Sequence, residues 1–473
     1  MEVKACMGCF VEWDKERAEC PVCGWSPQKP LEEDKNGWHQ GKIIAKRFLL
    51  GNCYLKKKDF VIWRTYDSLL DIRCYMITSV GGSLTQLLRI AWGFSQQTDK
   101  EGCPVVLSMF PVEQTYVLVF SMKEDIDKKD FLSLITLPKE NPKQVIQKLE
   151  YLNEKQKPEY ALSEDTLLDE RYRVIGCVGV GGFGITYFCE DLLLQRNVAV
   201  KEYFPSEWAE READALEVKN SRYLNAFLYG KKSFLKEAQI TAKFIHAQNI
   251  VTIYDVFSAN DTVYLVMEYL QGDSVGRRMK KRQYKPYSEK EAAEIILPSM
   301  KALRSIHESY VVHGDISPGN LICTKEGTVV LIDFGAAKYM TDKQPVLQAA
   351  FLKKNYAAPE QYQGRVSPAS DIFAPEQYRT AKEGIPRDEG AWTDIYAMGA
   401  TLYYLLTGHV PTDALTRLSS KKTELIPPKK YGVKIQKGYF QLICQMMELD
   451  KNLRIKNDQV VIDTLEKLCF KEK

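Results

Sequence analysis

The stretch VVHGDISPGN, residues 311–320, is the most informative part of this sequence. It reads as a loop that leaves an apolar run, and it holds a carboxylate, Asp315, and an amide, Asn320, five positions apart. A second motif, LIDFGAAK at 331–338, places Asp333 eighteen residues after Asp315. Carboxylate and amide oxygens bind Mg²⁺, and a carboxylate can accept the proton of a hydroxyl group. Together the two motifs supply groups that can hold a metal ion and accept a proton.

A glycine-rich segment precedes these motifs. Gly179, Gly181 and Gly184 form G-x-G-x-x-G, and glycine lets backbone N–H groups approach phosphates closely. The residues that follow read as two strands, so we expect a hairpin tip rather than the helix N-terminus of a dinucleotide-binding fold. The second strand ends in VAVK, which places Lys201 within reach of phosphate oxygens.

In this order the motifs resemble those of bacterial eukaryotic-like Ser/Thr protein kinases, and the resemblance covers residues 166–470. It implies an α+β, two-lobed protein-kinase fold with a β-rich N-lobe and a helical C-lobe. It also implies that ATP and Mg²⁺ are bound and that the γ-phosphoryl group is transferred to Ser or Thr of a protein substrate.

The resemblance assigns a role to each motif residue. Lys201 and Glu237, the latter in the helix-like KKSFLKEAQITAKF, would position the α- and β-phosphates. Asp315 would orient the acceptor hydroxyl, while Asn320 and Asp333 would hold Mg²⁺. The nucleotide would also contact the glycine loop and an adenine pocket with Met267 as gatekeeper: Gly179, Gly181, Gly184, Ala199, Met267, Glu268, Leu270 and Ile322.

Two positions depart from the family pattern. Gly314 replaces the arginine that in many kinases pairs with a phosphate on the activation segment, and Ser317 stands where Ser/Thr kinases usually carry a lysine near the γ-phosphate. H-G-D-x-x-x-x-N is also typical of small-molecule phosphotransferases of the aminoglycoside and choline kinase type. That class stays open as an alternative, as does a kinase-like scaffold that binds ATP without turnover.

The C-terminal half favours the protein kinase. YAAPEQY (356–362) and FAPEQY (373–378) both match the A-P-E element that ends an activation segment. AWTDIYAMGATLYYLLTG resembles the central C-lobe helix, whose Asp394 would brace the catalytic loop, and Arg454 would pair with the A-P-E glutamate. We favour Glu360 over Glu376 for that pair and interpret the other copy as an inserted repeat or a surface loop without function.

Two C-x-x-C pairs near the N-terminus predict a metal site. Each pair can aim two thiolates at one tetrahedral centre, so residues 1–28 are expected to form a structural zinc ribbon. A redox-active C-x-x-C is the alternative. Because sulfur fills all four positions, the ribbon is expected to serve structure or to recruit a protein partner rather than to catalyse. The expected ligands are Cys6, Cys9, Cys20 and Cys23.

The chain also resembles itself. LSMFPVEQTYVLVFSM (107–122) aligns with the segment 147 positions later, and RFLLGNCYLKKKDF aligns with RYRVIGCVGVGGF at an offset of 123 to 124. Unless this is a chance likeness of β-rich stretches, residues 41–150 form a degenerate copy of the kinase N-lobe. It has Lys56, Lys57, Lys58 and Asp59 in place of glycines, and Arg73–Met76 near the counterpart of Lys201, so we expect no nucleotide binding there.

Composition sets the remaining expectations. A chain of 473 residues predicts two or three domains. Its 65 basic and 62 acidic residues leave a net charge of +3, which does not call for a nucleic-acid partner. We find no apolar run of membrane-spanning length and expect a cytoplasmic protein with reduced thiols.

Overall fold

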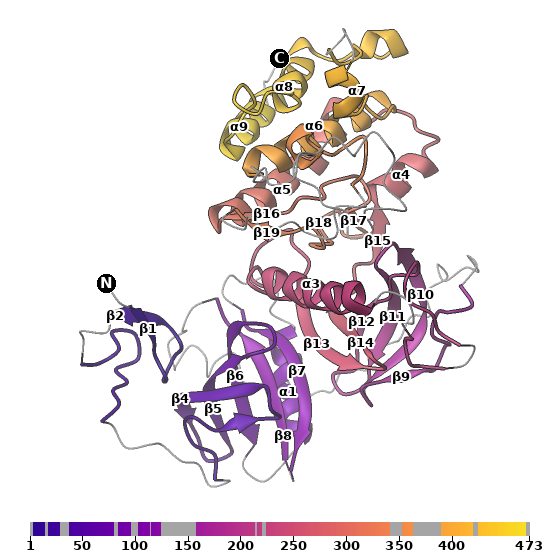
Figure 1. Cartoon of the computed structure of the whole chain (residues 1–473). Helices are drawn as coiled ribbons and strands as arrows, with labels where there is room; N and C mark the ends of the chain where they lie inside the picture. The colour runs from indigo at the N-terminus through magenta and orange to yellow at the C-terminus, as the bar shows by residue number, and fades with distance from the viewer. Residues whose placement is uncertain are drawn as a thin grey trace. The chain divides into compact units, whose positions relative to one another are not determined.

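The computed structural model describes residues 3–14, 18–28, 37–79, 84–95, 103–113, 115–123, 158–212, 215–219, 224–340, 352–362, 389–419 and 424–469. The chain divides into two compact units. The first contains most of the chain up to Tyr269, and the second contains most of helix α3 and the chain from Leu270 onwards. Figure 1 shows the strands of the first unit mainly in indigo to magenta and α5 to α9 of the second in salmon to yellow.

One sheet of the first unit carries the glycine loop. Its six antiparallel strands lie in the order β9-β10-β11-β12-β14-β13. Strand β11 is almost wholly buried and β12 is mostly buried, consistent with their Val-, Tyr- and Phe-rich sequences. The strands are β9 (Leu167–Leu168), β10 (Tyr172–Gly181), β11 (Gly184–Asp191), β12 (Arg196–Tyr203), β13 (Ile253–Ala259) and β14 (Thr262–Glu268).

A second sheet has the same strand order. It runs β3-β4-β5-β6-β8-β7, and α1 (Leu84–Ser95) follows β6 as α3 (Leu224–Ala242) follows β12. Leu87, Ile90 and Phe94 of α1 pack into an apolar core with the sheet. The strands are β3 (Ile43–Ile44), β4 (Phe48–Lys56), β5 (Phe60–Asp67), β6 (Ile72–Ser79), β7 (Val105–Val112) and β8 (Thr115–Ser121).

The two sheets also share their strand pairing. Corresponding strands pair in the same register at the two offsets, and the register shifts in β4 and β10, and in β7 and β13, fall at equivalent positions. Bulges bend a strand in a specific way, so their shared positions are hard to reconcile with a chance likeness.

Strand pairing also refines the comparison of individual residues. Lys201 pairs with Thr186, and the equivalent pair in the first copy is Ile77 with Ile62. The counterpart of Lys201 is therefore the fully buried Ile77, one residue beyond the Arg73–Met76 stretch that the sequence comparison pointed to. The prediction erred by one residue because apolar similarity does not specify register. The three loop glycines correspond to Leu55, Lys57 and Phe60.

Each copy contains the same arginine–aspartate pair. Arg47 binds Asp67 through hydrogen bonds of 2.8 and 2.6 Å, and the equivalent Arg171 binds Asp191 through bonds of 2.8 and 2.5 Å. Bidentate pairs of this kind hold the arginine side chain in one direction. Each arginine side chain is thereby held in an orientation in which it also reaches the other copy.

The two copies contact each other through equivalent residues. Arg47 Nη1 lies 2.5 Å from Asp255 Oδ1, and Arg171 Nη1 donates to Ser108 Oγ at 2.7 Å. Ser108 is the counterpart of Asp255 in the first copy, and its hydroxyl donates to Asp255 Oδ2 at 3.1 Å. Reciprocal contacts between equivalent positions are the mark of a two-fold interface, here formed within one chain.

The second unit is built around two long helices. Every residue of α6 from Thr393 to Thr407 is buried, as expected for a helix that is apolar on all sides. Helix α5 begins with a capping box between Ser288 and Glu291. Its helices are α4 (Val275–Lys281), α5 (Glu289–Glu308), α6 (Ala391–Thr407), α7 (Ala414–Ser419), α8 (Lys437–Met446) and α9 (Asp458–Cys469), with 3₁₀ turns η2 (Pro359–Tyr362) and η4 (Pro428–Tyr431).

Short strands frame the loop that contains Asp315. Strand β16 (Val311–Val312) precedes it and pairs with β19 (Lys338–Tyr339). Strand β17 (Leu321–Thr324) follows it and pairs with β15 (Gly272–Ser274) and β18 (Val329–Leu331). A β-rich part and a helical part are thus both present, as the predicted α+β class requires. Among the described residues, no helix is long and apolar enough to span a membrane.

Candidate active site

One carboxylate of α6 braces the predicted catalytic loop. Asp394 accepts hydrogen bonds from the backbone N–H groups of His313 and Gly314, both at 2.8 Å. Gly314 has φ +77, a left-handed conformation that favours glycine, and a Cβ there would lie 2.9 Å from the Ala336 carbonyl oxygen. The predicted role of Asp394 is confirmed. Glycine is required at position 314 because the backbone there is left-handed and leaves no room for a Cβ.

Asp315 and Asn320 are in direct contact. Asn320 Nδ2 donates to the Asp315 carbonyl oxygen at 2.8 Å and to Asp315 Oδ2 at 2.9 Å. Burial raises the pKa of the Asp315 carboxyl, although the nearby Lys353 ammonium opposes this shift. The spacing of five residues therefore closes a compact loop around the carboxylate.

Asp333 lies near Glu237 in the second unit. Asp333 has φ +66, which is uncommon for a residue with a side chain, and such outliers gather at functional sites. A Cβ on Gly335 would lie 3.2 Å from Asp333 Oδ1 and 3.5 Å from Glu237 Oε2. Glu237 is 4% exposed on α3, which confirms the inward face predicted for it. Gly335 thus leaves room for two predicted site carboxylates.

The glycine loop forms the β10–β11 hairpin, as predicted. A Cβ would meet nothing within 4 Å at Gly179 and only a backbone oxygen 3.8 Å away at Gly181. At Gly184 it would lie 2.2 Å from the Glu202 carbonyl oxygen, so this glycine is required by the packing of β11 against β12. Only the first two glycines leave open backbone for a ligand. Lys201 lies on β12 between Thr186 and Leu265 of the neighbouring strands.

The residues predicted to contact adenine fall in both units. Ala199 and Met267 are direct partners on β12 and β14, and Glu268 ends β14 in the first unit. Leu270 and Ile322, the latter on β17, belong to the second unit. The strand positions agree with the prediction, while their meeting around one adenine stays a prediction.

The A-P-E glutamate pairs as predicted. Arg454 Nη1 and Nη2 donate to Glu360 Oε1 and Oε2 at 2.7 and 3.2 Å, and both side chains are buried. Thr393 Oγ1 of α6 donates to Glu360 at 2.9 Å. The structure therefore confirms Glu360 as the partner of Arg454. Glu376 and the rest of the second A-P-E copy lie outside the described residues.

A buried histidine connects three helices behind the loop. His307 of α5 lies 2.9 Å from Asp394 Oδ2 and 2.7 Å from Asp458 Oδ2 at the start of α9. Burial alone lowers the pKa of His307, but hydrogen bonds with the two carboxylates outweigh it and raise this pKa to about 9. The imidazolium is thus part of the support of Asp394.

This cluster predicts a pH dependence of stability. Because the folded pKa of His307 exceeds the ordinary 6.5, its contribution to the free energy of unfolding is complete below pH 6.5 and is lost as the pH rises to about 9. The thermal midpoints of the wild-type chain and His307→Gln should therefore converge between these pH values. A gap that stays constant would contradict the prediction. Burial lowers the pKa of His246 to about 4, so that residue does not titrate in this window.

Sequence reasoning missed Lys353. Its Nζ lies 2.8 Å from Asp315 Oδ2 and 2.9 Å from Ser317 Oγ. Lys353 belongs to none of the sequence motifs. The sequence pointed to a missing lysine only through Ser317, which stands where a lysine was expected.

Sequence reasoning also missed Glu202, the neighbour of Lys201. Its fully buried carboxylate accepts hydrogen bonds from Tyr187 at 2.8 Å and Tyr264 at 2.7 Å, and it pairs with Arg211. These partners satisfy the buried charge, so Glu202 is part of the support of the strand that carries Lys201.

The four N-terminal cysteines form one cluster. Their ligand atoms all lie within 4.8 Å of one another, with Sγ separations of 3.6 Å for Cys6 and Cys23 and for Cys9 and Cys20. Tetrahedral Zn–S bonds of about 2.3 Å imply sulfur separations of about 3.8 Å, so this donor set fits zinc. The two knuckles repeat one hydrogen bond, from residue i+4 to the carbonyl oxygen of Cys6 or Cys20, at 2.8 and 2.9 Å.

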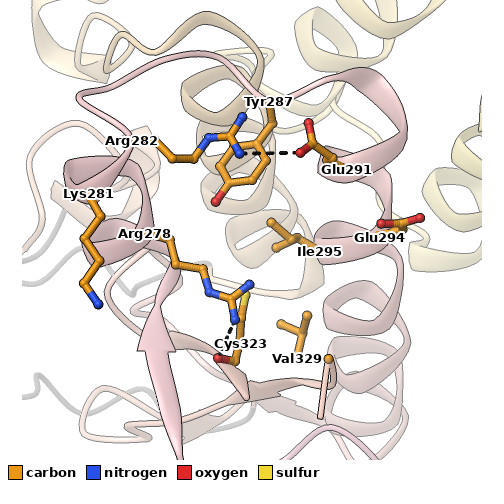
Figure 2. A pocket seen from close by; sticks show the side chains of 10 residues that line it. Arg278, Lys281, Arg282, Tyr287, Glu291, Glu294, Ile295, Cys323 and Val329 are labelled. Atoms are coloured by element: carbon orange, nitrogen blue, oxygen red, sulfur yellow. Dashed lines mark hydrogen bonds and ion pairs between the residues drawn. The ribbon is translucent and has the colours of Figure 1, made fainter. Parts of the chain in front are cut away.

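A cavity of about 470 Å³ lies among α4, α5 and β17 of the second unit (Figure 2). Its basic side chains already have partners. Arg278 donates to the Cys323 carbonyl oxygen at 3.0 Å, and Arg282 lies 3.5 Å from Glu291. Lys281 lies 2.5 Å from Asp273. The positive charges that line this cavity are therefore used within the fold.

Comparison with known proteins gives a consistent result. Residues 172–464 match the family model described as protein kinase domain. A probable serine/threonine-protein kinase of Clostridium perfringens is 30% identical over 310 residues, which cover 64% of this chain and 39% of that protein. Serine/threonine-protein kinase B of Synechocystis is 29% identical over 308 residues, 64% of this chain and 48% of that protein. The chain thus spans less than half of the length of these relatives.

A solved structure shows the same fold. The chain titled "PpkA-294 apo form" superimposes with a TM-score of 0.53 at 23% sequence identity, covering 65% of this chain and 100% of that one.

Proposed function

Because the chain belongs to the protein kinase domain family, we propose that it transfers the γ-phosphoryl group of ATP to Ser or Thr hydroxyl groups of a protein. The observation that carries this proposal is the braced loop in which Asn320 bonds to the Asp315 carboxylate while Asp394 holds the backbone before it. Such a loop keeps a proton acceptor and an oxygen ligand in fixed positions, which phosphoryl transfer needs.

The proposed step is an in-line displacement. The acceptor hydroxyl oxygen forms a bond to the γ-phosphorus as the bond from that phosphorus to the β–γ bridging oxygen breaks. ADP leaves with the electron pair, and the hydroxyl proton passes to the Asp315 carboxylate. Lys201 and the open backbone at Gly179 and Gly181 would hold phosphates.

The oxygens of Asn320 and Asp333 suit a hard cation. When bound with ATP, Mg²⁺ would neutralise charge on the phosphates. Asp333 is already held in an uncommon backbone conformation, and Gly335 leaves space beside its carboxylate.

Transfer to a small molecule is the principal alternative, because small-molecule phosphotransferases carry the same H-G-D motif. The buried pair of Glu360 and Arg454 supports the protein kinase, since it ties the end of the activation segment to the helical unit. The names of the relatives, serine/threonine-protein kinases, support the same acceptor class.

The test is to incubate the chain with Mg-ATP and either a generic protein acceptor or aminoglycoside and choline acceptors. Mass spectrometry should find phosphate on Ser or Thr of protein, and none with Asp333→Asn, which excludes a contaminating kinase. Phosphate on small molecules alone would replace the proposal with the small-molecule enzyme. ATP binding without transfer to any acceptor would favour the scaffold.

We also propose that residues 41–150 are a degenerate N-lobe that binds no nucleotide. The repeat supports this interpretation through its shared strand order, and Ile77 supplies no charge where Lys201 lies in the second copy. Residues 124–150 of this segment lie outside the described part of the chain.

We propose further that the cysteine cluster binds one structural Zn²⁺ and that the ribbon recruits a protein partner. Mass spectrometry for metals should find one zinc per chain, and Cys20→Ser with Cys23→Ser should lose it, because two thiolates alone cannot fill a tetrahedral site. Cys444→Ser, on α8, is the matched control and should retain the metal. A metal-free wild-type chain purified without chelator would contradict this prediction.

A further inference from the structure

The loop that carries Asp315 has no cation of its own. Residues 315–320 contain neither lysine nor arginine, and Ser317 stands at the position where a lysine was expected. Phosphoryl transfer places negative charge on the γ-phosphoryl oxygens in the transition state, so a cation beside the proton acceptor is valuable there. The structure supplies one from a distant part of the chain.

Lys353 occupies this place. Its ammonium contacts both Asp315 Oδ2, at 2.8 Å, and Ser317 Oγ, at 2.9 Å. The side chain of Lys353 is 37% exposed and that of Asp315 is 23% exposed, so the pair remains open to an incoming substrate.

The backbone holds Lys353 at this point. Its carbonyl oxygen accepts hydrogen bonds from the N–H groups of Tyr356 at 2.8 Å and Ala357 at 3.0 Å, which form a turn. The turn leads directly into η2, whose Glu360 is paired with Arg454 and whose Gln361 donates to the Gly314 carbonyl oxygen at 2.8 Å. Lys353 is therefore joined by one turn to η2, and η2 is hydrogen-bonded to the catalytic loop through Gln361.

The two carboxylate oxygens of Asp315 differ in their contacts. Lys353 and Asn320 both donate to Oδ2. Within the described residues, Oδ1 receives no hydrogen bond and remains for the acceptor hydroxyl. Two donors on one oxygen hold the carboxylate plane in a single orientation.

We propose that Lys353 is a positioning residue for phosphoryl transfer and that Ser317 and Lys353 together replace the usual lysine of the catalytic loop. Lys353 orients Asp315 so that Oδ1 faces the acceptor hydroxyl, and its ammonium offers positive charge to the transferring phosphoryl group. This inference rests on the proposed function, and it adds Lys353 to the residues that act where the acceptor hydroxyl binds.

The test compares Lys353→Met with Lys354→Met in the full-length chain. Lys353→Met should lower kcat about 10²-fold, the scale seen when one preorganised donor is removed, with little change in the affinity for Mg-ATP. Lys354 is the matched control because it is adjacent and 59% exposed and lies 3.7 Å from Asp413 rather than near Asp315. Its variant should keep the wild-type kcat.

A swap separates positioning from folding. Ser317→Lys combined with Lys353→Ser returns a cation to the same place from the other side, so the double variant should recover at least tenfold of the lost kcat. A merely structural role would not predict recovery. Thermal midpoints and Mg-ATP binding, measured for every variant, show whether each is folded.

The outcomes are distinct. If the wild-type chain transfers phosphate and Lys353→Met does so equally fast, the inference is wrong and the proposed function stands. A faster Lys353→Met would mean that the contact blocks Asp315, which also overturns the inference. Loss without recovery in the swap would assign Lys353 to structure. If the wild-type chain transfers nothing to protein, the proposed function fails and the inference falls with it.

Discussion

Replacing Asp315 by asparagine is expected to lower kcat for phosphoryl transfer about 10²- to 10⁴-fold, the usual contribution of a positioned general base. Asparagine has nearly the same shape and could still contact Asn320 and Lys353, but its amide cannot accept the hydroxyl proton. Because Asp315 is expected to act on the acceptor rather than on the nucleotide, the dissociation constant for Mg-ATP should change little.

Transfer rates and calorimetric titration of Mg-ATP measure the two quantities separately. Asp463→Asn makes the same chemical change on the exposed face of α9 and should leave both unchanged. A wild-type kcat in Asp315→Asn would remove the carboxylate from the mechanism. A large loss of Mg-ATP affinity would instead assign it to nucleotide binding.

Replacing Asp255 by alanine is expected to destabilise the interface between the two repeat copies by about 3–5 kcal/mol, as when one partner of a buried ion pair is removed. The carboxylate lies 2.5 Å from Arg47 and 3.6 Å from Arg171, and the side chains of Asp255 and Arg171 are 7% and 5% exposed. Its loss would leave the buried Arg171 and the partly exposed Arg47 facing each other, each with only the carboxylate of its own copy, Asp191 or Asp67, as a partner.

Hydrogen exchange of backbone amides in β7 and β13 measures this effect locally, since these strands carry Ser108 and Asp255. Protection should fall in both strands although only one is mutated. Asp59→Ala, at the exposed β4–β5 turn, is the matched control and should leave both unchanged. Full protection of β7 in Asp255→Ala would show that the copies do not depend on this carboxylate.

The sequence by itself determined the features that depend on short spacings. Five residues between Asp315 and Asn320 close one loop, and G-x-G-x-x-G forms one hairpin turn. Two C-x-x-C pairs form two knuckles with the same hydrogen bond. In each case the interacting groups lie within a few residues of one another, so residue type and spacing define the local geometry.

Partial information was available for the longer-range features. The repeat was visible at its two offsets, but strand pairing was needed to identify Ile77 as the counterpart of Lys201. Glu360 and Glu376 occur in similar motifs, and the buried contact with Arg454 identified the first as its partner.

Only the tertiary structure decided which distant charges meet. Lys353 reaches Asp315 across 38 residues, and Ser108 reaches Asp255 across 147. The requirement for glycine at 184 likewise comes from the backbone of a neighbouring strand rather than from a ligand. Such contacts depend on how whole elements pack. A single lysine or aspartate in the sequence does not identify the partner that packing will bring to it.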